Sequence, residues 1–182
     1  MGKVYEAIDD GLAAFVQAQP VWFVATAPLA SDGHVNVSPR GHDCLSVLGP
    51  HRVAWVDYTG SGIETAAHLR ENGRICLMFM SYGPRPRVVR LHGRGSVALP
   101  GTPAYEQVVA LHPPHPSTRA VVVVDVERVS DSCGYGVPVM EVVAERELLR
   151  LGAEKRGPDG LRAYRAEHNT SVDGLPGLPV SS

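Results

Sequence analysis

The sequence is short of lysine and has no long apolar run, and both shortages exclude classes of protein. Only two of its 182 residues are lysine, against fifteen arginines, and the net charge is −2. A near-neutral chain lacks the basic surface that sequence-independent nucleic-acid binding requires. No stretch approaches the roughly 20 apolar residues of a membrane-spanning helix. We therefore expect a globular protein that binds neither nucleic acid nor membrane.

Cysteine is also scarce, which bears on the cellular compartment. Cys44, Cys76 and Cys133 are an odd number without the CxxC spacing of metal or redox motifs. This usage is typical of reduced thiols inside cells. Asp9 and Asp10 stand where a signal peptide would need an apolar core. The sequence therefore predicts a cytoplasmic protein.

Valine is abundant, with 26 residues against three isoleucines, and β-branched side chains favour strands. The run 120–129 is almost continuously apolar, which predicts a strand buried on both faces. Gly93 and Gly95 predict a bulge or sharp bend within another strand. Short turns between strands favour a closed or partly closed antiparallel barrel over a βαβ sheet. The predicted strands span 21–27, 34–40, 44–48, 52–58, 74–80, 88–99 and 120–129.

Helical spacing of apolar residues is confined to a few segments. The predicted helices cover 4–18, 64–72, 103–111, 141–149 and 161–168, and we expect the tail 173–179 to be extended. The fold class is accordingly mainly β with peripheral helices. We expect one domain over 1–182, with a barrel core at about 15–138 and a helical C-terminal arm at about 139–182.

The strand 34–40 carries its polar residues on one face. Asn36, Ser38 and Arg40 alternate with Val35 and Val37, so an amide, a hydroxyl and a guanidinium point the same way. Such a face can bind a phosphate or the polar edge of a heterocycle. The alternative is an ordinary strand with one solvated face.

A second candidate site is the loop 58–65, which joins a predicted strand to a predicted helix. Its glycines can aim backbone N–H groups at an anion, and Thr59, Ser61 and Thr65 add hydroxyl donors. The spacing is not that of a Walker A loop, which also needs a lysine. The alternative is a plain turn with a side-chain helix cap.

Weaker signals lie elsewhere in the chain. Arg90 belongs to a positive stripe on the strand 88–99, which could contact an acidic ligand or merely be a solvated face. Tyr135 lies between two glycines and could stack on a ligand, or simply end a turn. His112 and His115 suggest a metal-assisted hydrolase only distantly, because they lack helical zinc-ligand spacing. We predict no metal site.

Several of these segments, in this order, resemble one family. The resemblance extends from about residue 15 to 177 and rests on the joint order of motifs that are each modest. The combination is similar to the pyridoxamine 5′-phosphate oxidase-related, FMN-binding split-barrel family. The segments that carry it are Phe23-Val24-Ala25-Thr26-Ala27, Asn36-Val37-Ser38-Pro39-Arg40-Gly41, Asp57-Tyr58-Thr59-Gly60-Ser61-Gly62, Glu64 to Ile75, Arg90 to Gly95 and Ser132 to Pro138.

The resemblance implies a split antiparallel β-barrel that forms a homodimer with FMN at the subunit interface. It places Asn36, Ser38 and Arg40 along the flavin, and Thr59, Ser61 and Thr65 near its phosphate. The chain departs from the oxidases proper, which carry a lysine in the helix where this sequence has no lysine. The full set of implied cofactor-binding residues is Asn36, Ser38, Pro39, Arg40, Thr59, Gly60, Ser61, Gly62, Glu64 and Thr65.

The function that follows is an FMN-dependent oxidoreductase acting on a small organic substrate, with hydride transfer through flavin N5. Arg90 and Tyr135 are the expected substrate contacts. A deazaflavin is the alternative cofactor, and haem a further one. A non-catalytic protein that binds or senses flavin or haem is the alternative function. The C-terminal substrate-binding segment of the oxidases is not recognisable, so vitamin B6 synthesis is not expected.

Overall fold

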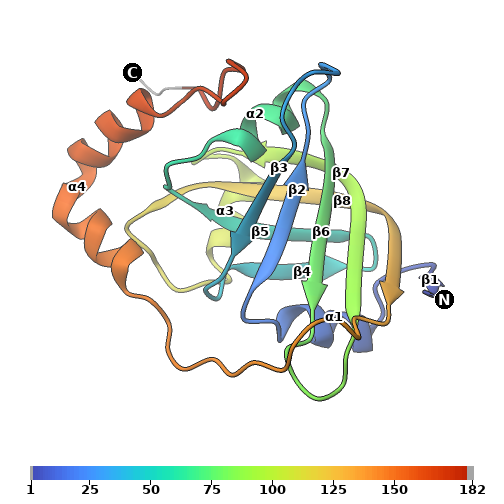
Figure 1. Ribbon diagram of the computed structural model, residues 1–182. Coiled ribbons are helices and arrows are strands. Elements are labelled where there is room, and N and C mark those ends of the chain that lie inside the picture. The colour runs from blue at the N-terminus through green and yellow to red at the C-terminus, as the bar shows by residue number, and fades with distance from the viewer. Residues whose placement is uncertain (1, 180–182) are drawn as a thin grey trace.

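The computed structural model describes residues 2–179 and is built on one antiparallel sheet of eight strands. The sheet curves into a barrel (Figure 1), and its strand order is β3-β2-β6-β7-β8-β5-β4, with β1 added to β8. The predicted split antiparallel barrel is therefore confirmed. The strands are β1 (Val4–Tyr5), β2 (Trp22–Thr26), β3 (Asn36–Arg40), β4 (Leu45–Gly49), β5 (Arg52–Tyr58), β6 (Arg74–Met80), β7 (Val88–Ala98) and β8 (Thr118–Ser132).

The two longest strands, β7 and β8, have the irregularity and the burial that the glycine and valine patterns predict, with one correction. The register of β7 against β8 shifts between His92 and Gly93, which confirms the predicted irregularity. Strand β8 is buried on both faces only in its first half, as far as Val124. From Asp125 onward only Val126 and Val129 are buried, because this part of β8 turns one face to solvent.

The helices are α1 (Asp10–Gln17), α2 (Glu64–Glu71), α3 (Pro103–Val109) and α4 (Leu148–Glu167). The prediction of one helix over 4–18 is wrong at its start. Val4 and Tyr5 pair with β8 instead, and α1 begins only after Asp9, whose carboxylate accepts a hydrogen bond from the Leu12 amide at 2.7 Å. That cap sets the helix start.

The C-terminal segment differs most from expectation. The predicted helix at 141–149 is wrong, because the chain runs irregularly up to Glu147 and α4 then continues to Glu167 with a kink at Gly157. The side chain of Val143 is 96% exposed, so its apolar pattern does not mark a buried helix face. The tail is not extended but turns back, with the Ser171 amide donating to the Leu175 carbonyl at 2.9 Å. Figure 1 shows α4 standing beside the barrel.

The barrel interior is apolar and centred on three aromatic side chains. Trp22 lies 5.3 Å from Trp55 edge-on and 5.5 Å from Phe79 in a stacked arrangement, measured between ring centroids. All three are almost fully buried. Within residues 2–179, no helix is long and apolar enough to cross a bilayer. The proposed boundaries of core and arm stay a prediction.

Candidate functional site

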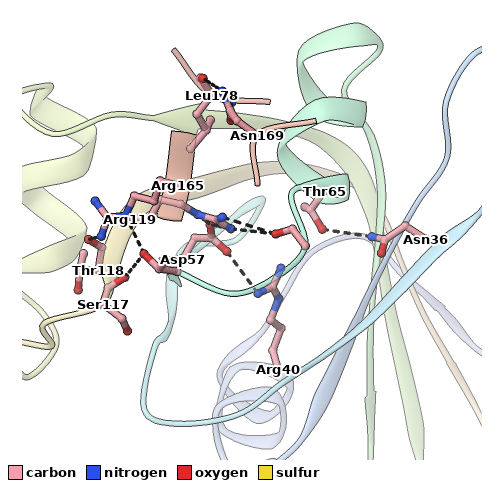
Figure 2. A network of polar contacts seen from close by, with 12 residues as sticks. Asn36, Arg40, Asp57, Thr65, Ser117, Thr118, Arg119, Arg165, Asn169 and Leu178 are labelled. Atoms are coloured by element: carbon pink, nitrogen blue, oxygen red, sulfur yellow. Dashed lines mark hydrogen bonds and ion pairs between the residues drawn. The ribbon is translucent and has the colours of Figure 1, made fainter. Parts of the chain in front are cut away.

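A buried carboxylate joins strands from distant parts of the sheet. Asp57, near the end of β5, is 4% exposed. Its Oδ1 lies 3.3 Å from Nη1 of Arg40, the last residue of β3, and its Oδ2 lies 2.7 Å from Nη2 of Arg119 in β8. Nε of Arg119 also donates to Oδ2 at 2.8 Å, and Figure 2 shows Arg40, Asp57 and Arg119 grouped together. One carboxylate thus holds two guanidinium groups in place.

A third arginine reaches this group from α4. Nε of Arg165 donates to Oγ1 of Thr59 at 2.8 Å, and its Nη2 donates to the Thr118 carbonyl at 3.0 Å. Burial, and after it the charge of Arg119, lower the pKa of Arg165 below its ordinary value. Arg40 and Arg119 share the one carboxylate of Asp57, and Arg165 lies close enough for the charges of Arg119 and Asp57 to act on it, so the group carries an excess of positive charge. Such an excess favours an anionic ligand.

A polar network next to this group attaches β3 to the start of α2. Nδ2 of Asn36 donates to Oγ1 of Thr26 at 3.1 Å and to Oγ1 of Thr65 at 3.2 Å. Oγ of Ser38 donates to Oδ1 of Asn36 at 3.0 Å. Thr26 also lies 3.0 Å from Nδ1 of His68, which is fully buried. The network engages the side-chain amide of Asn36 and the hydroxyl of Thr65, and it fixes the helix on the strand.

Arg40 forms part of the wall of a cavity of about 620 Å³, together with Tyr58, Thr59 and Gly60. Residues of the irregular segment before α4 also line it. Nε of Arg40 is buried and has no hydrogen-bond partner among the described residues. The volume lies in the range of cofactor pockets, about 300–1,000 Å³. The cavity therefore has in its wall a cation with an unpaired hydrogen-bond donor, and it is large enough to hold a ligand.

Two other groups in this wall are neutral at physiological pH. Burial raises the pKa of Tyr58 to about 12, so its phenol keeps its proton and can donate a hydrogen bond. Burial likewise raises the pKa of Cys44 to about 12. A thiol that stays protonated is a poor nucleophile, which excludes Cys44 as an attacking group.

The predicted cofactor-binding residues fall into three groups in the structure. Those that line the cavity are Pro39, Arg40, Thr59 and Gly60. Those in the adjoining network are Asn36, Ser38 and Thr65. Ser61 and Gly62 lie exposed in the loop, and the Glu64 carboxylate accepts hydrogen bonds from the Val172 amide at 3.2 and 3.3 Å.

The two predicted substrate contacts do not line the same cavity within one chain. Nη1 of Arg90 donates to Oγ of Ser132 at 3.1 Å. Tyr135 is 82% exposed and borders a separate cavity of about 810 Å³ beside Arg87 and Asp131. Their role toward a substrate stays a prediction.

The two histidines of the proline-rich loop have different partners. Nε2 of His112 lies 2.8 Å from Oγ of Ser46, while its Nδ1 lies 3.5 Å from Oδ1 of Asp43. Nδ1 of His115 lies 2.7 Å from Oγ of Ser117. The order Ser-His-Asp resembles a hydrolase triad, but Ser46 is only 8% exposed. Among residues 2–179, no group of three His, Cys, Asp or Glu side chains could hold a metal ion.

Sequence reasoning missed Asp57, Arg119 and Arg165 as members of the site. Asp57 follows the apolar segment 53–56, and Arg119 precedes the apolar segment 120–124. A single charge at the end of a buried strand could have identified both residues, since a buried charge needs a partner of opposite sign. Nothing in the pattern of α4 distinguishes Arg165 from the other arginines of that helix.

Comparison with known proteins agrees with this architecture. The profile described as Pyridoxamine 5′-phosphate oxidase matches residues 8–133. The pyridoxamine 5′-phosphate oxidase family protein ustO of Aspergillus flavus is 40% identical over 194 residues, covering 96% of this chain and 77% of that protein.

Solved structures show the same fold at low sequence identity. A single-residue variant of HupZ from Group A Streptococcus matches with a TM-score of 0.54 at 19% identity, over 69% of this chain and 99% of that one. A Lactobacillus delbrueckii protein, described as a candidate pyridoxamine 5′-phosphate oxidase, also gives 0.54, at 18% identity over 70% and 98%. With the profile match and the Aspergillus relative, the chain belongs to the pyridoxamine 5′-phosphate oxidase family.

Proposed function

We propose that this protein is an FMN-dependent oxidoreductase that acts on a small organic substrate by hydride transfer through flavin N5. The observation that carries the proposal is Arg40 in the wall of the 620 Å³ cavity, with its Nε buried and unpartnered. Membership of the family supports a flavin as the ligand. The split-barrel fold supports it as well.

The residues present suit a flavin phosphate even without the lysine of the oxidases. Arg40 shares Asp57 with Arg119, so the carboxylate does not neutralise both guanidinium groups. The positive charge left over can offset a phosphate where a lysine would otherwise do so. Thr59 and Gly60 lie beside Arg40 in the same wall and would contact the same end of the cofactor.

When bound, flavin supplies hydride transfer at N5, and the protein supplies orientation and exclusion of water. Arg40 would bind and orient the phosphate end. The neutral phenol of Tyr58 can donate a hydrogen bond within the same cavity. Residues of the segment 142–149 line the cavity and would exclude water from the side of the cofactor that they contact. No side chain of the site is required as a general acid or base.

The purified protein is expected to bind FMN, and Arg40→Ala is expected to weaken that binding by about 1.5–3 kcal/mol, since a charge-assisted hydrogen bond is lost. Fluorescence titration of FMN measures the dissociation constant. Arg52→Ala is the matched control, because Arg52 forms a surface ion pair with Asp125 and does not line the cavity. An unchanged constant for Arg40→Ala would place the phosphate elsewhere.

The absorption spectrum separates the alternatives. Flavin bands support the proposal, a Soret band favours haem, and a protein that retains neither FMN nor deazaflavin contradicts a flavin function. Reduction of the bound flavin by a nicotinamide cofactor in stopped flow then distinguishes an enzyme from a non-catalytic binder. An enzyme also has to pass electrons to or from a small organic substrate.

We further propose that the protein works as a homodimer with the cofactor at the interface. Large apolar side chains are exposed on the edge strand β3 and its approach, and on the segment before α4, where a partner would cover them. They include Val35, Val37, Val139, Val142 and Val143. Sedimentation velocity should give a dimer for the unmodified chain. Val37→Asp should shift it toward monomer, while Val172→Asp, at an exposed site in the tail, should not.

A further inference from the structure

A second, smaller cavity of about 300 Å³ lies where α4 and the tail meet the barrel. Arg119 from β8 and Arg162 and Arg165 from α4 line one side of it. Ile63, Leu99 and Leu178 line the other. Residues from five separate parts of the chain thus enclose one space, with cations facing apolar side chains.

The cationic side is only partly neutralised. Arg119 is 8% exposed and is paired with Asp57. Arg165 donates only to neutral groups, the Thr59 hydroxyl and the Thr118 carbonyl, and its Nη1 has no hydrogen bond within residues 2–179. Arg162 pairs with Asp159, an exposed carboxylate on the same helix. An anion in the cavity would meet guanidinium groups that still have donors to offer.

The apolar side belongs to a small hydrophobic cluster of its own. Ile63 is 3% exposed and Leu178 is 9% exposed, and both pack with Ala66 and Ala120. Leu99 packs against the same cluster while half-buried. A ligand with an apolar body would gain about 25 cal/mol for each Å² that it buries on this side.

The tail is fixed in place as one wall of the cavity. The Asn169 side chain brackets Leu178 by donating to its carbonyl at 2.6 Å and accepting from its amide at 2.8 Å. A Cβ at Gly177 would lie 2.3 Å from Oδ1 of Asn169 and 2.4 Å from Cγ1 of Ile63, so only glycine fits there. The hydrogen bonds of Asn169 and the close packing at Gly177 therefore hold the tail in this position.

We propose that this cavity binds a small amphiphilic carboxylate, that is, a carboxylate group attached to a compact apolar body. The carboxylate would bind Arg162 and Arg165, and the apolar body would pack on Ile63 and Leu178. The guanidinium fork matches the planar carboxylate. This site is separate from the proposed flavin site, because Asp57 lies between Arg119 on one side and Arg40 on the other.

The probe for this site is 3-phenylpropionate, titrated by isothermal calorimetry into the full chain with and without bound FMN. One molecule per chain is expected to bind in both conditions. Arg165→Gln and Arg162→Gln are each expected to weaken binding about tenfold or more, because each removes a charged hydrogen-bond donor. Arg162 is 65% exposed, so its variant tests the site without disturbing the fold. Arg150→Gln, on the same helix but outside the cavity, should leave binding unchanged.

Neutral and truncated probes decide the ligand class. The amide 3-phenylpropanamide should bind about tenfold or more weakly, and acetate more weakly still, since it lacks the apolar body. Equal binding of acid and amide, or inorganic phosphate binding more tightly than 3-phenylpropionate, would overturn the proposal. Competition between FMN and the probe would overturn the separateness of the two sites. A protein that fails to bind FMN but binds the probe refutes only the flavin function.

Discussion

Asp57→Asn is expected to lower the free energy of unfolding by about 3–5 kcal/mol, the usual loss when one partner of a buried ion pair is removed. Arg119 is 8% exposed and the Arg40 side chain 21% exposed, so neither charge can be fully hydrated once the carboxylate is gone. The contact also joins β3, at one end of the strand order, to β5 near the other end. Urea denaturation measures the change.

The matched control is Asp125→Asn. Asp125 pairs with Arg52 on the surface, where the side chains are 63% and 57% exposed, and exposed pairs of this kind contribute less than about 1 kcal/mol. Similar losses in the two variants would contradict the central role given to Asp57. A loss confined to Asp57→Asn supports it, and FMN affinity should fall in parallel because Arg40 loses its fixed position.

Gly93→Ala is expected to destabilise the barrel by about 3 kcal/mol, the upper end of what added volume costs in a packed site. A Cβ at this position would lie 2.0 Å from the Asp125 carbonyl oxygen and 3.0 Å from Cα of Val126. Both atoms belong to the backbone of β8, which cannot move aside without breaking its pairing with β7. Thermal or urea denaturation measures the loss.

Gly49→Ala is the control, because Gly49 also lies at a register shift between two strands, yet a Cβ there meets no atom within 4 Å. Removing glycine at an unstrained position is expected to change stability by less than about 1 kcal/mol, in the stabilising direction. If Gly93→Ala were equally harmless, the close approach of β7 and β8 at the bulge would have to be wrong.

The local structure of the barrel follows from local sequence. Alternating or continuous apolar runs predicted β2 to β8 within a few residues, because side-chain burial in strands depends on periodicity along the chain itself. The same reasoning located α2 and α3. It failed at 4–5 and 141–149, where pairing with a distant strand, or the lack of a surface to pack on, decided the conformation.

The candidate site was predicted only in part, for a physical reason. Strand β3 and the loop after β5 carry visible polar patterns, and Pro39, Arg40, Thr59 and Gly60 do line the cavity of about 620 Å³. The anchor of the site does not show in any pattern, because Asp57 and Arg119 are 62 residues apart in the chain. Only the pairing of β5 with β8 brings them together.

The sequence by itself determined the strand-rich fold and the family. It also showed that this chain has no lysine in the helix where the resemblance to the oxidases leads one to expect it. Those properties reside in composition and in periodicity along the chain. The tertiary structure decided which arginines come together, by bringing Arg40 and Arg119 onto Asp57 and Arg165 onto Thr59. Arg165 lies 106 residues beyond Thr59, and charges so distant in sequence can act on one site only after packing has removed water from between them.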